Sequence, residues 1–191
     1  MVAPATALGV DLILFAQSAD DSAAQIASHV IGDYTNLEAL KKFADQCDVI
    51  TFEHELVPQS VIKGLEAHGV RVYPPSQAFL YSQDKEAMRT KLSEFLSPTW
   101  KIATRASDVD HYPVIGKTIS GGYDGRGVWK INSQDELVEI LKTTSKLLIE
   151  EIISFDAEIA VMVARSPHGQ ATSWTPTETV QEDGICTITV S

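Results

Sequence analysis

The chain has 191 residues, of which 44% are hydrophobic and 21% charged, so it can bury a sizeable core and global disorder is excluded. Its 26 Asp and Glu outnumber its 15 Lys and Arg, which gives a net charge of −11. An acidic chain repels nucleic acid and anionic membranes, and no apolar run reaches the roughly 18 residues that a membrane span needs. Two distant cysteines, Cys47 and Cys186, fit no metal spacing and are typical of a reducing compartment. We therefore expect a cytoplasmic protein with small-molecule substrates, and neither nucleic acid nor membrane as a partner.

The first part of the chain alternates predicted strands and helices. Three short apolar runs are typical of buried strands: residues 10–16, 48–52 and 70–73. Two helices are predicted between them: residues 37–47 and 58–69. Thr35 and Glu38 match a capping box, while Pro58 begins the second helix and Gly69 ends it. This alternation predicts a doubly wound parallel sheet, and residues 1–9 resemble the end of a helix, so we expect the sheet to lack its first strand.

The remainder of the chain has a different pattern. Residues 76–96 are predicted to be helical in two stretches separated at Asp84 and Lys85. Strands are then expected at 113–119 and 128–131. Ser133 with Glu136 predicts a second capping box, which opens a helix that continues to about Lys142. Four later segments predict antiparallel strands: residues 146–153, 158–165, 171–180 and 185–191. We therefore expect an α/β chain with two domains, a Rossmann-like parallel-sheet domain over 1–76 and an α+β domain over 77–191.

A glycine-rich turn joins the strands predicted at 113–119 and 128–131. Four glycines fall within seven positions: Gly121, Gly122, Gly125 and Gly127. Glycines let backbone N–H groups approach a ligand closely, and Lys117 and Arg126 add positive charge, so the turn is a candidate phosphate cradle. A P-loop is excluded because its first glycine would fall at His111 and because Lys117 lies in a strand. A tight hairpin with an incidental lysine remains an equal alternative at this point.

The run Glu53-His54-Glu55 resembles a cluster of metal ligands. On a strand, Glu53 and Glu55 would share one face and His54 would take the other, so the three side chains could not converge. We therefore expect no metal site there, although an acidic strand end at the carboxyl edge of a parallel sheet suits substrate binding. No nucleophile paired with a base is recognisable, and no catalytic residue is assigned.

Residues 117–127, K-T-I-S-G-G-Y-D-G-R-G, resemble the mobile glycine-rich loop of ATP-grasp enzymes. The Tyr-Asp-Gly-Arg-Gly version is similar to that of the 5-(carboxyamino)imidazole ribonucleotide synthetases of purine biosynthesis. Four other segments agree with this family in order: residues 48–58, 83–85, 150–158 and 178–185. The resemblance covers nearly the whole chain. It implies a Rossmann-like pre-ATP-grasp domain followed by an ATP-grasp domain that is incomplete at its C-terminal end.

The resemblance also implies a set of ATP-binding residues. Lys117 and Lys85 would contact phosphates, Glu158 would accept hydrogen bonds from the ribose, and Gln181 stands where the family often has His. The lid over the phosphates would comprise Gly122, Tyr123, Asp124, Gly125, Arg126, Gly127 and Val128. The adenine edge would meet backbone groups of Glu150, Glu151, Ile152 and Ile153. Without the resemblance, Lys85 indicates a solvated helix start, Asp124 an ordinary turn, and Glu150 with Glu151 an exposed strand pair.

The implied reaction is the ATP-dependent carboxylation of 5-aminoimidazole ribonucleotide by bicarbonate. Its products are 5-(carboxyamino)imidazole ribonucleotide, ADP and phosphate, and the implied enzyme is a Mg²⁺-dependent homodimer. The family's Mg²⁺ ligands are expected beyond Ser191, so we expect this chain to be a fragment, truncated at both ends and inactive alone. Two alternatives stay open. One is another ATP-grasp ligase, such as a formate-using glycinamide ribonucleotide transformylase or a biotin carboxylase, and the other is a non-catalytic nucleotide-binding module.

Overall fold

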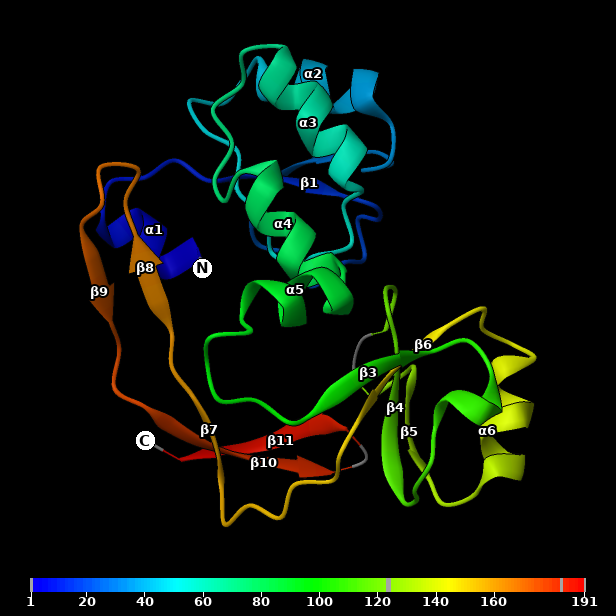
Figure 1. Cartoon of the computed structure of the whole chain (residues 1–191). Coiled ribbons are helices and arrows are strands. Elements are labelled where there is room, and N and C mark those ends of the chain that lie inside the picture. The colour runs from blue at the N-terminus through cyan, green and yellow to red at the C-terminus, as the bar shows by residue number, and fades with distance from the viewer. Residues whose placement is uncertain (1, 123–124, 183, 191) are drawn as a thin grey trace. The chain divides into compact units, whose positions relative to one another are not determined.

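The computed structural model describes residues 2–122, 125–182 and 184–190, and it divides into two compact units (Figure 1). Unit 1 is Met1–Met88 and unit 2 is Arg89–Ser191. Both contain helices and strands, and the predicted fold class is confirmed. In the described part of the chain, no helix is both long enough and apolar enough to cross a membrane.

Unit 1 is built on a short parallel sheet. Its elements are α1 (Val2–Ala7), β1 (Ile13–Ala16), β2 (Ser28–Ile31), α2 (Leu37–Ala44), α3 (Gln59–Ala67), α4 (Ser76–Gln83) and the start of α5 (Lys85–Lys91). β1 pairs with β2 in parallel, and Ile50 forms a parallel bridge with Val72. The parallel pairing was predicted, but the expected strands at 48–52 and 70–73 are reduced to that single bridge. β2 was missed because its four residues begin with polar Ser28 and His29 and show no clear alternation.

The capping box predicted at Thr35 and Glu38 is wrong by one residue. Helix α2 is capped by Asn36, whose side-chain oxygen accepts a hydrogen bond from the Ala39 N–H at 3.1 Å. The Thr35 hydroxyl instead donates to the Asp33 carboxylate at 2.7 Å. The Thr35 N–H also donates to Asp33, at 2.8 Å, so Thr35 belongs to a turn that precedes the helix and Asn36 takes the cap position.

Helices α2, α3 and α4 share the core of unit 1. Its largest contributors are Leu40, Phe43, Ile62, Leu65 and Phe79. The start of α4 is fixed by a carboxylate from α3, because the backbone N–H and the hydroxyl of Ser76 both donate to Glu66, at 2.7 and 2.5 Å. This satisfies donors that a helix start leaves unpaired.

Unit 2 contains an antiparallel four-stranded sheet in the order β3-β6-β4-β5. Its elements are β3 (Trp100–Ala103), a short 3₁₀ turn (Ala106–Asp108), β4 (Val114–Thr118), β5 (Val128–Ile131), α6 (Gln134–Leu141) and β6 (Leu147–Glu150). The hairpin of β4 and β5 is confirmed, and β5 has the predicted bounds. The helix expected to continue to residue 96 ends at Lys91. β3 was not predicted, since a four-residue edge strand with a central lysine carries little hydrophobic signal.

Helix α6 covers one face of this sheet (Figure 1). Buried Leu137 of α6 packs in one cluster with Val114, Ile131 and Ile149 of the sheet. The predicted cap is confirmed in part, because the Ser133 hydroxyl accepts from the Glu136 N–H at 3.3 Å. In a complete capping box the Glu136 carboxylate would accept from the N–H of Ser133. Here it accepts instead from the N–H of Asn132, at 2.8 Å.

The C-terminal strands of unit 2 form two smaller antiparallel sheets. Their elements are β7 (Glu158–Ala160), β8 (Val163–Arg165), β9 (Ala171–Ser173), β10 (Thr177–Glu182) and β11 (Ile185–Val190). One sheet has the order β11-β10-β7 and the other joins β8 to β9. The antiparallel pairing is confirmed, although the strands predicted at 158–165 and 171–180 each divide into two. Within the described part of these strands, no residue is buried.

Candidate functional site

Strand register places Lys117 and Glu150 on the same face of the four-stranded sheet. Lys117 of β4 lies opposite Leu148 of β6, and Ile115 lies opposite Glu150. Side chains of directly opposed residues share a face, and residues two apart along a strand do so as well. We call this the Lys117 face. The opposite face carries Val114 and Ile149 and packs against α6.

Glu150 lies at the centre of a buried charge cluster on the Lys117 face. Its side chain is only 3% exposed. Arg89 contacts one carboxylate oxygen, Oε1, through Nη2 and through Nε at 2.6 Å. The ammonium of Lys117 contacts the other oxygen, Oε2, at 2.5 Å. The exposed strand pair that the sequence alone indicated at Glu150 is therefore wrong, because two cations make burial of this carboxylate tolerable.

The cluster of Arg89, Lys117 and Glu150, here called the Glu150 cluster, keeps one net positive charge. Two cations surround a single carboxylate, so one charge is left over. The three side chains are unequally accessible, at 26% exposed for Lys117, 16% for Arg89 and 3% for Glu150. The surplus charge is thus presented mainly through Lys117. This suits an anion such as a phosphate, which Lys binds as a point charge.

Arg89 was not identified from the sequence. Its local pattern in α5 is that of a solvated helix residue, and its partner Glu150 lies 61 positions later in the chain. Only the fold brings the two together. No signal within the helical segment could have distinguished Arg89 from its neighbours.

The glycine-rich turn begins at Gly121, four residues after Lys117. Gly121, Gly125 and Gly127 have φ angles of +75°, +76° and +73°, which side-chain-bearing residues rarely adopt. A Cβ on Gly127 would lie 2.5 Å from the hydroxyl oxygen of Thr118, whereas a Cβ on Gly121 would meet no atom of the described residues within 4 Å. The turn therefore packs tightly at its base and is open at Gly121, as a phosphate cradle requires. Tyr123 and Asp124 lie outside the described residues.

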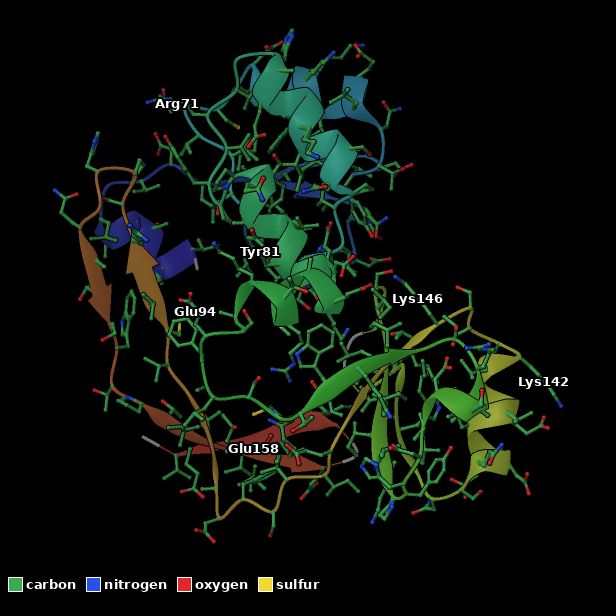
Figure 2. All side chains as sticks on the ribbon, viewed as in Figure 1. Arg71, Tyr81, Glu94, Lys142, Lys146 and Glu158 are labelled. Atoms are coloured by element: carbon green, nitrogen blue, oxygen red, sulfur yellow. The ribbon has the colours of Figure 1, made fainter. Side chains whose placement is uncertain are left out.

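The turn between β10 and β11 approaches the glycine-rich turn closely. Gly184 has a φ of +80°, and a Cβ there would lie 2.5 Å from the Cα of Gly125. On the same sheet, Glu158 of β7 lies opposite Thr179 of β10, and Gln181 is two residues further along β10. The pairing of β10 with β11 shifts register between Val180 and Gln181, which interrupts the alternation of side chains there. Glu158 and Gln181 therefore lie in the same sheet, in which Figure 2 labels Glu158.

The segment after β6 has free backbone groups. The N–H of Glu151 donates to the carbonyl of Thr99 at 3.1 Å, and the Glu151 carboxylate accepts from the N–H of Thr99 at 2.7 Å. Hydrogen bonds to the carboxylate from the backbone N–H and the side chain of Thr99 lower the pKa of Glu151. Among the described residues, no backbone hydrogen bond involves Ile152 or Ile153, which are 41% and 45% exposed. Their N–H and C=O groups are accessible to a ligand.

In the segment Gln83-Asp84-Lys85 of unit 1, the side chains of Gln83 and Asp84 hydrogen-bond to the backbone of unit 1. The Gln83 amide donates to the carbonyls of Glu55 and Val57, at 2.5 and 2.6 Å. The Asp84 carboxylate accepts from the Ala87 N–H at 2.8 Å and caps α5, which Lys85 begins. Glu55 and its two predecessors lie in a bend and turn, so the strand geometry expected for Glu53-His54-Glu55 is wrong.

A groove beside α6 is a less suitable site for an anion. This α6 groove is lined by Trp129, Lys130, Asp135, Glu136, Val138, Glu139 and Ile140. Three carboxylates against one lysine repel phosphates. Among the described residues, no three His, Cys, Asp or Glu side chains come together in a way that could hold a metal ion.

Two domain families match the chain. Residues 81–191 match the ATP-grasp domain family, and residues 1–83 match the ribonucleotide synthetase preATP-grasp domain. A Mycobacterium tuberculosis protein named N5-carboxyaminoimidazole ribonucleotide synthase is 38% identical, over 98% of this chain and 47% of that protein. The chain thus spans about half the length of the curated relatives it matches.

Two solved structures have the same fold. The Staphylococcus aureus N5-carboxyaminoimidazole synthetase complexed with ADP has a TM-score of 0.86 and 26% identity, over 95% of this chain and 52% of that one. The Aspergillus clavatus N5-carboxyaminoimidazole synthase, in complex with ADP and 5-aminoimidazole ribonucleotide, has a TM-score of 0.78 and 27% identity, over 98% and 52%. The chain therefore belongs to the ATP-grasp family, with a preATP-grasp domain followed by an ATP-grasp domain.

Proposed function

We propose that this chain is the nucleotide-binding part of a ligase that carboxylates 5-aminoimidazole ribonucleotide with bicarbonate at the expense of ATP. The observation that carries the proposal is the Glu150 cluster, whose surplus positive charge lies next to an open glycine-rich turn. Relatives named for this activity match nearly the whole chain. One of them has been solved with both ADP and 5-aminoimidazole ribonucleotide.

In the proposed complex, the phosphates of ATP lie between Lys117 and the glycine-rich turn. Lys117 neutralises charge on the α- and β-phosphates, and the lid from Gly122 to Val128 supplies N–H donors. The unhindered position at Gly121 leaves room for a phosphate to approach the backbone. Lys85, which begins α5 in unit 1, stays a predicted nucleotide contact.

The base and the sugar would be held by the elements that follow. The backbone groups of Ile152 and Ile153 are accessible and suit the donor and acceptor edge of adenine. Glu158 is a carboxylate on an exposed strand, and an ionised carboxylate can accept hydrogen bonds from both ribose hydroxyls. Gln181, in the same sheet as Glu158, is proposed as a further nucleotide contact.

The proposed chemistry proceeds in two steps. A bicarbonate oxygen attacks the γ-phosphorus of ATP, which releases ADP and forms carboxyphosphate. The exocyclic amine of the ribonucleotide then takes the carboxyl carbon, phosphate leaves, and the amine loses a proton. The contribution of this chain is to bind and orient ATP and to exclude water with the lid, because carboxyphosphate hydrolyses rapidly.

Several features of the whole enzyme are proposals as well. We propose a cytoplasmic homodimer, with the boundary between its first two domains at residues 76 and 77. Among the described residues, no group of three His, Cys, Asp or Glu side chains is placed to hold a metal ion. We propose that the ligands of Mg²⁺ come from the part of the relatives that this chain does not match.

A chimaera tests the proposed reaction. These 191 residues would replace the matching segment of the Mycobacterium tuberculosis relative, and ADP release would be measured with each candidate acceptor. We expect release that depends on 5-aminoimidazole ribonucleotide and bicarbonate and is abolished by Lys117→Gln. Release that depends instead on glycinamide ribonucleotide with formate, or on biotin, would assign a different ATP-grasp ligase. A chimaera that binds ADP and turns over no acceptor would favour a non-catalytic nucleotide-binding module.

A further inference from the structure

Arg89 and Lys117 contact different oxygens of the same carboxylate. Two of the three Arg89 side-chain nitrogens, Nε and Nη2, meet Oε1 of Glu150, whereas the Lys117 ammonium meets Oε2. Either cation can therefore leave the carboxylate while the other stays bound to it. An ammonium has three N–H donors, and Oε2 occupies one of them.

The charges of the cluster depend on Arg89. With all three residues present, one positive charge is left over. Without Arg89, the carboxylate of Glu150 would cancel the charge of Lys117, and the cluster would be neutral. A buried carboxylate with a single partner also holds that partner more strongly, because releasing it would leave an unpaired charge in a low-dielectric site.

We infer that Arg89 is a positioning residue for nucleotide binding: by neutralising Glu150, it leaves the charge of Lys117 available to a phosphate. When a phosphate arrives, Lys117 turns from Oε2 toward the ligand while Arg89 keeps Glu150 paired. The order of exposure fits these roles, since Lys117 is the most accessible member and Glu150 the least. The inference rests on the proposed nucleotide site at Lys117.

If the Arg89–Glu150 ion pair had only a structural role, ADP binding by the variants would differ from what this charge balance predicts. If Arg89 only stabilised the fold, removing Glu150 as well would not restore ligand binding. If Glu150 itself contacted the nucleotide, its replacement by Gln would weaken binding in every background. In the charge-balance account, Arg89→Gln together with Glu150→Gln leaves one positive charge on Lys117, as in the parent chain.

The experiment is a set of ADP titrations by calorimetry on the full 191-residue chain. The variants are Arg89→Gln, Arg89→Lys, Glu150→Gln and the double variant Arg89→Gln/Glu150→Gln. Arg105→Gln is the matched control, because Arg105 pairs with Asp108 at 3.2 Å and is exposed. Lys117→Gln tests whether ADP binds at Lys117. Circular dichroism and urea unfolding verify that each variant is folded.

We expect Arg89→Gln to weaken ADP binding about tenfold, and the double variant to restore the Kd to within about threefold of the parent. Arg89→Lys and Arg105→Gln should stay within about threefold of the parent. If Arg89→Gln does not fold, Glu150→Gln is compared with the double variant instead. Glu150→Gln keeps the positive charges of both Arg89 and Lys117, so it should bind ADP more tightly than the double variant.

Two outcomes would overturn the inference. A double variant that binds as weakly as Arg89→Gln would refute it while leaving the nucleotide site intact, provided that Lys117→Gln also weakens binding. A parent chain that binds no ADP, or a Lys117→Gln variant that binds normally, would refute the proposed site and this inference together.

Discussion

A buried carboxylate is costly, and unit 2 contains one at Glu150. Transfer of a single charge from water into a protein interior costs several kcal/mol, on the order of what a buried ion pair gains. Here the cost is offset by three contacts from two cations. A cluster of this kind contributes little net stability. Its consequence is electrostatic, because it fixes a positive charge next to the glycine-rich turn.

Glu158 gives a prediction specific to the sugar. If its carboxylate accepts hydrogen bonds from the ribose, the parent chain should bind ATP about tenfold more tightly than 2′-deoxy-ATP, and Glu158→Ala should remove most of that preference. Competition titrations with the two nucleotides measure this. Glu178→Ala, on the neighbouring strand β10, is the matched control. A Glu158→Ala variant that still prefers ATP would show that the ribose is held elsewhere.

Asp108 gives a prediction about pH. The N–H groups of Thr104 and Arg105, each at 2.9 Å, lower the pKa of Asp108 from 3.8 to about 2. Because the folded pKa lies below the unfolded one, this stabilisation is complete above about pH 4 and is lost as the pH falls toward 2. Urea unfolding of Asp108→Asn should therefore show a shallower loss of stability over this range than the parent. Asp156→Asn is the control. If the free energy of unfolding of Asp108→Asn fell with pH as steeply as that of the parent, the prediction would be contradicted.

For single residues, the sequence was informative where the role depends on neighbours in the chain. The lysine before the glycine-rich turn and the Ser133 cap follow from their neighbours in the chain, and Ser133 was confirmed. Arg89 and the burial of Glu150 could not be predicted. Both depend on a contact between residues 61 positions apart, which no local pattern encodes.

Among the elements, two of the hairpins of unit 2 meet through glycines. The glycine-rich turn between β4 and β5 and the turn between β10 and β11 approach at Gly125 and Gly184. Such contact without side chains allows two backbones to lie together and to separate again. A lid needs this freedom if it is to close over a ligand.

Gly184→Ala tests this contact. Both Gly184 and Gly169 have positive φ, at +80° and +91°, so alanine costs about 1–2 kcal/mol of backbone strain at either position. Only at Gly184 would the new methyl group also meet backbone, 2.5 Å from Gly125, whereas Gly169 has open space. We expect Gly184→Ala to weaken ATP binding severalfold more than Gly169→Ala. Equal affinities would indicate that the hairpins do not meet when ATP is bound.

Predictability of the elements depended on their length and surroundings. β5 and α6 were predicted well, because a clear apolar run and a serine cap mark them. β2 and β3 were missed, since both have four residues and carry polar side chains that a buried strand would not. These two are formed by their partners β1 and β6, which is a tertiary effect.

On the scale of the whole molecule, burial is uneven. Unit 1 and the four-stranded sheet of unit 2 each have a hydrophobic cluster, whereas the described strand residues between 158 and 190 include none that is buried. Large apolar side chains such as Ile159, Met162 and Trp174 are exposed there. Patches of this kind commonly mark contact surfaces.

This unevenness predicts a gradient of hydrogen exchange. The amides of β6, the central strand with four buried residues, should exchange slowest. Those of β8 and β9, an exposed two-stranded sheet, should exchange fastest. Exchange followed by mass spectrometry resolves the two regions. Similar protection in both would mean that the exposed strands are stabilised by association between chains, which a dilution series would reveal.

The central claim is that a nucleotide binds on the Lys117 face and not in the α6 groove. Titration of the ¹⁵N-labelled chain with ATP, followed by amide chemical shifts, tests it directly. We predict shifts at Lys117, Gly122, Ile152 and Glu158, with the amides of the α6 groove unaffected, and loss of these shifts in Lys117→Gln. Shifts confined to the α6 groove, or none at all in a folded chain, would contradict the account.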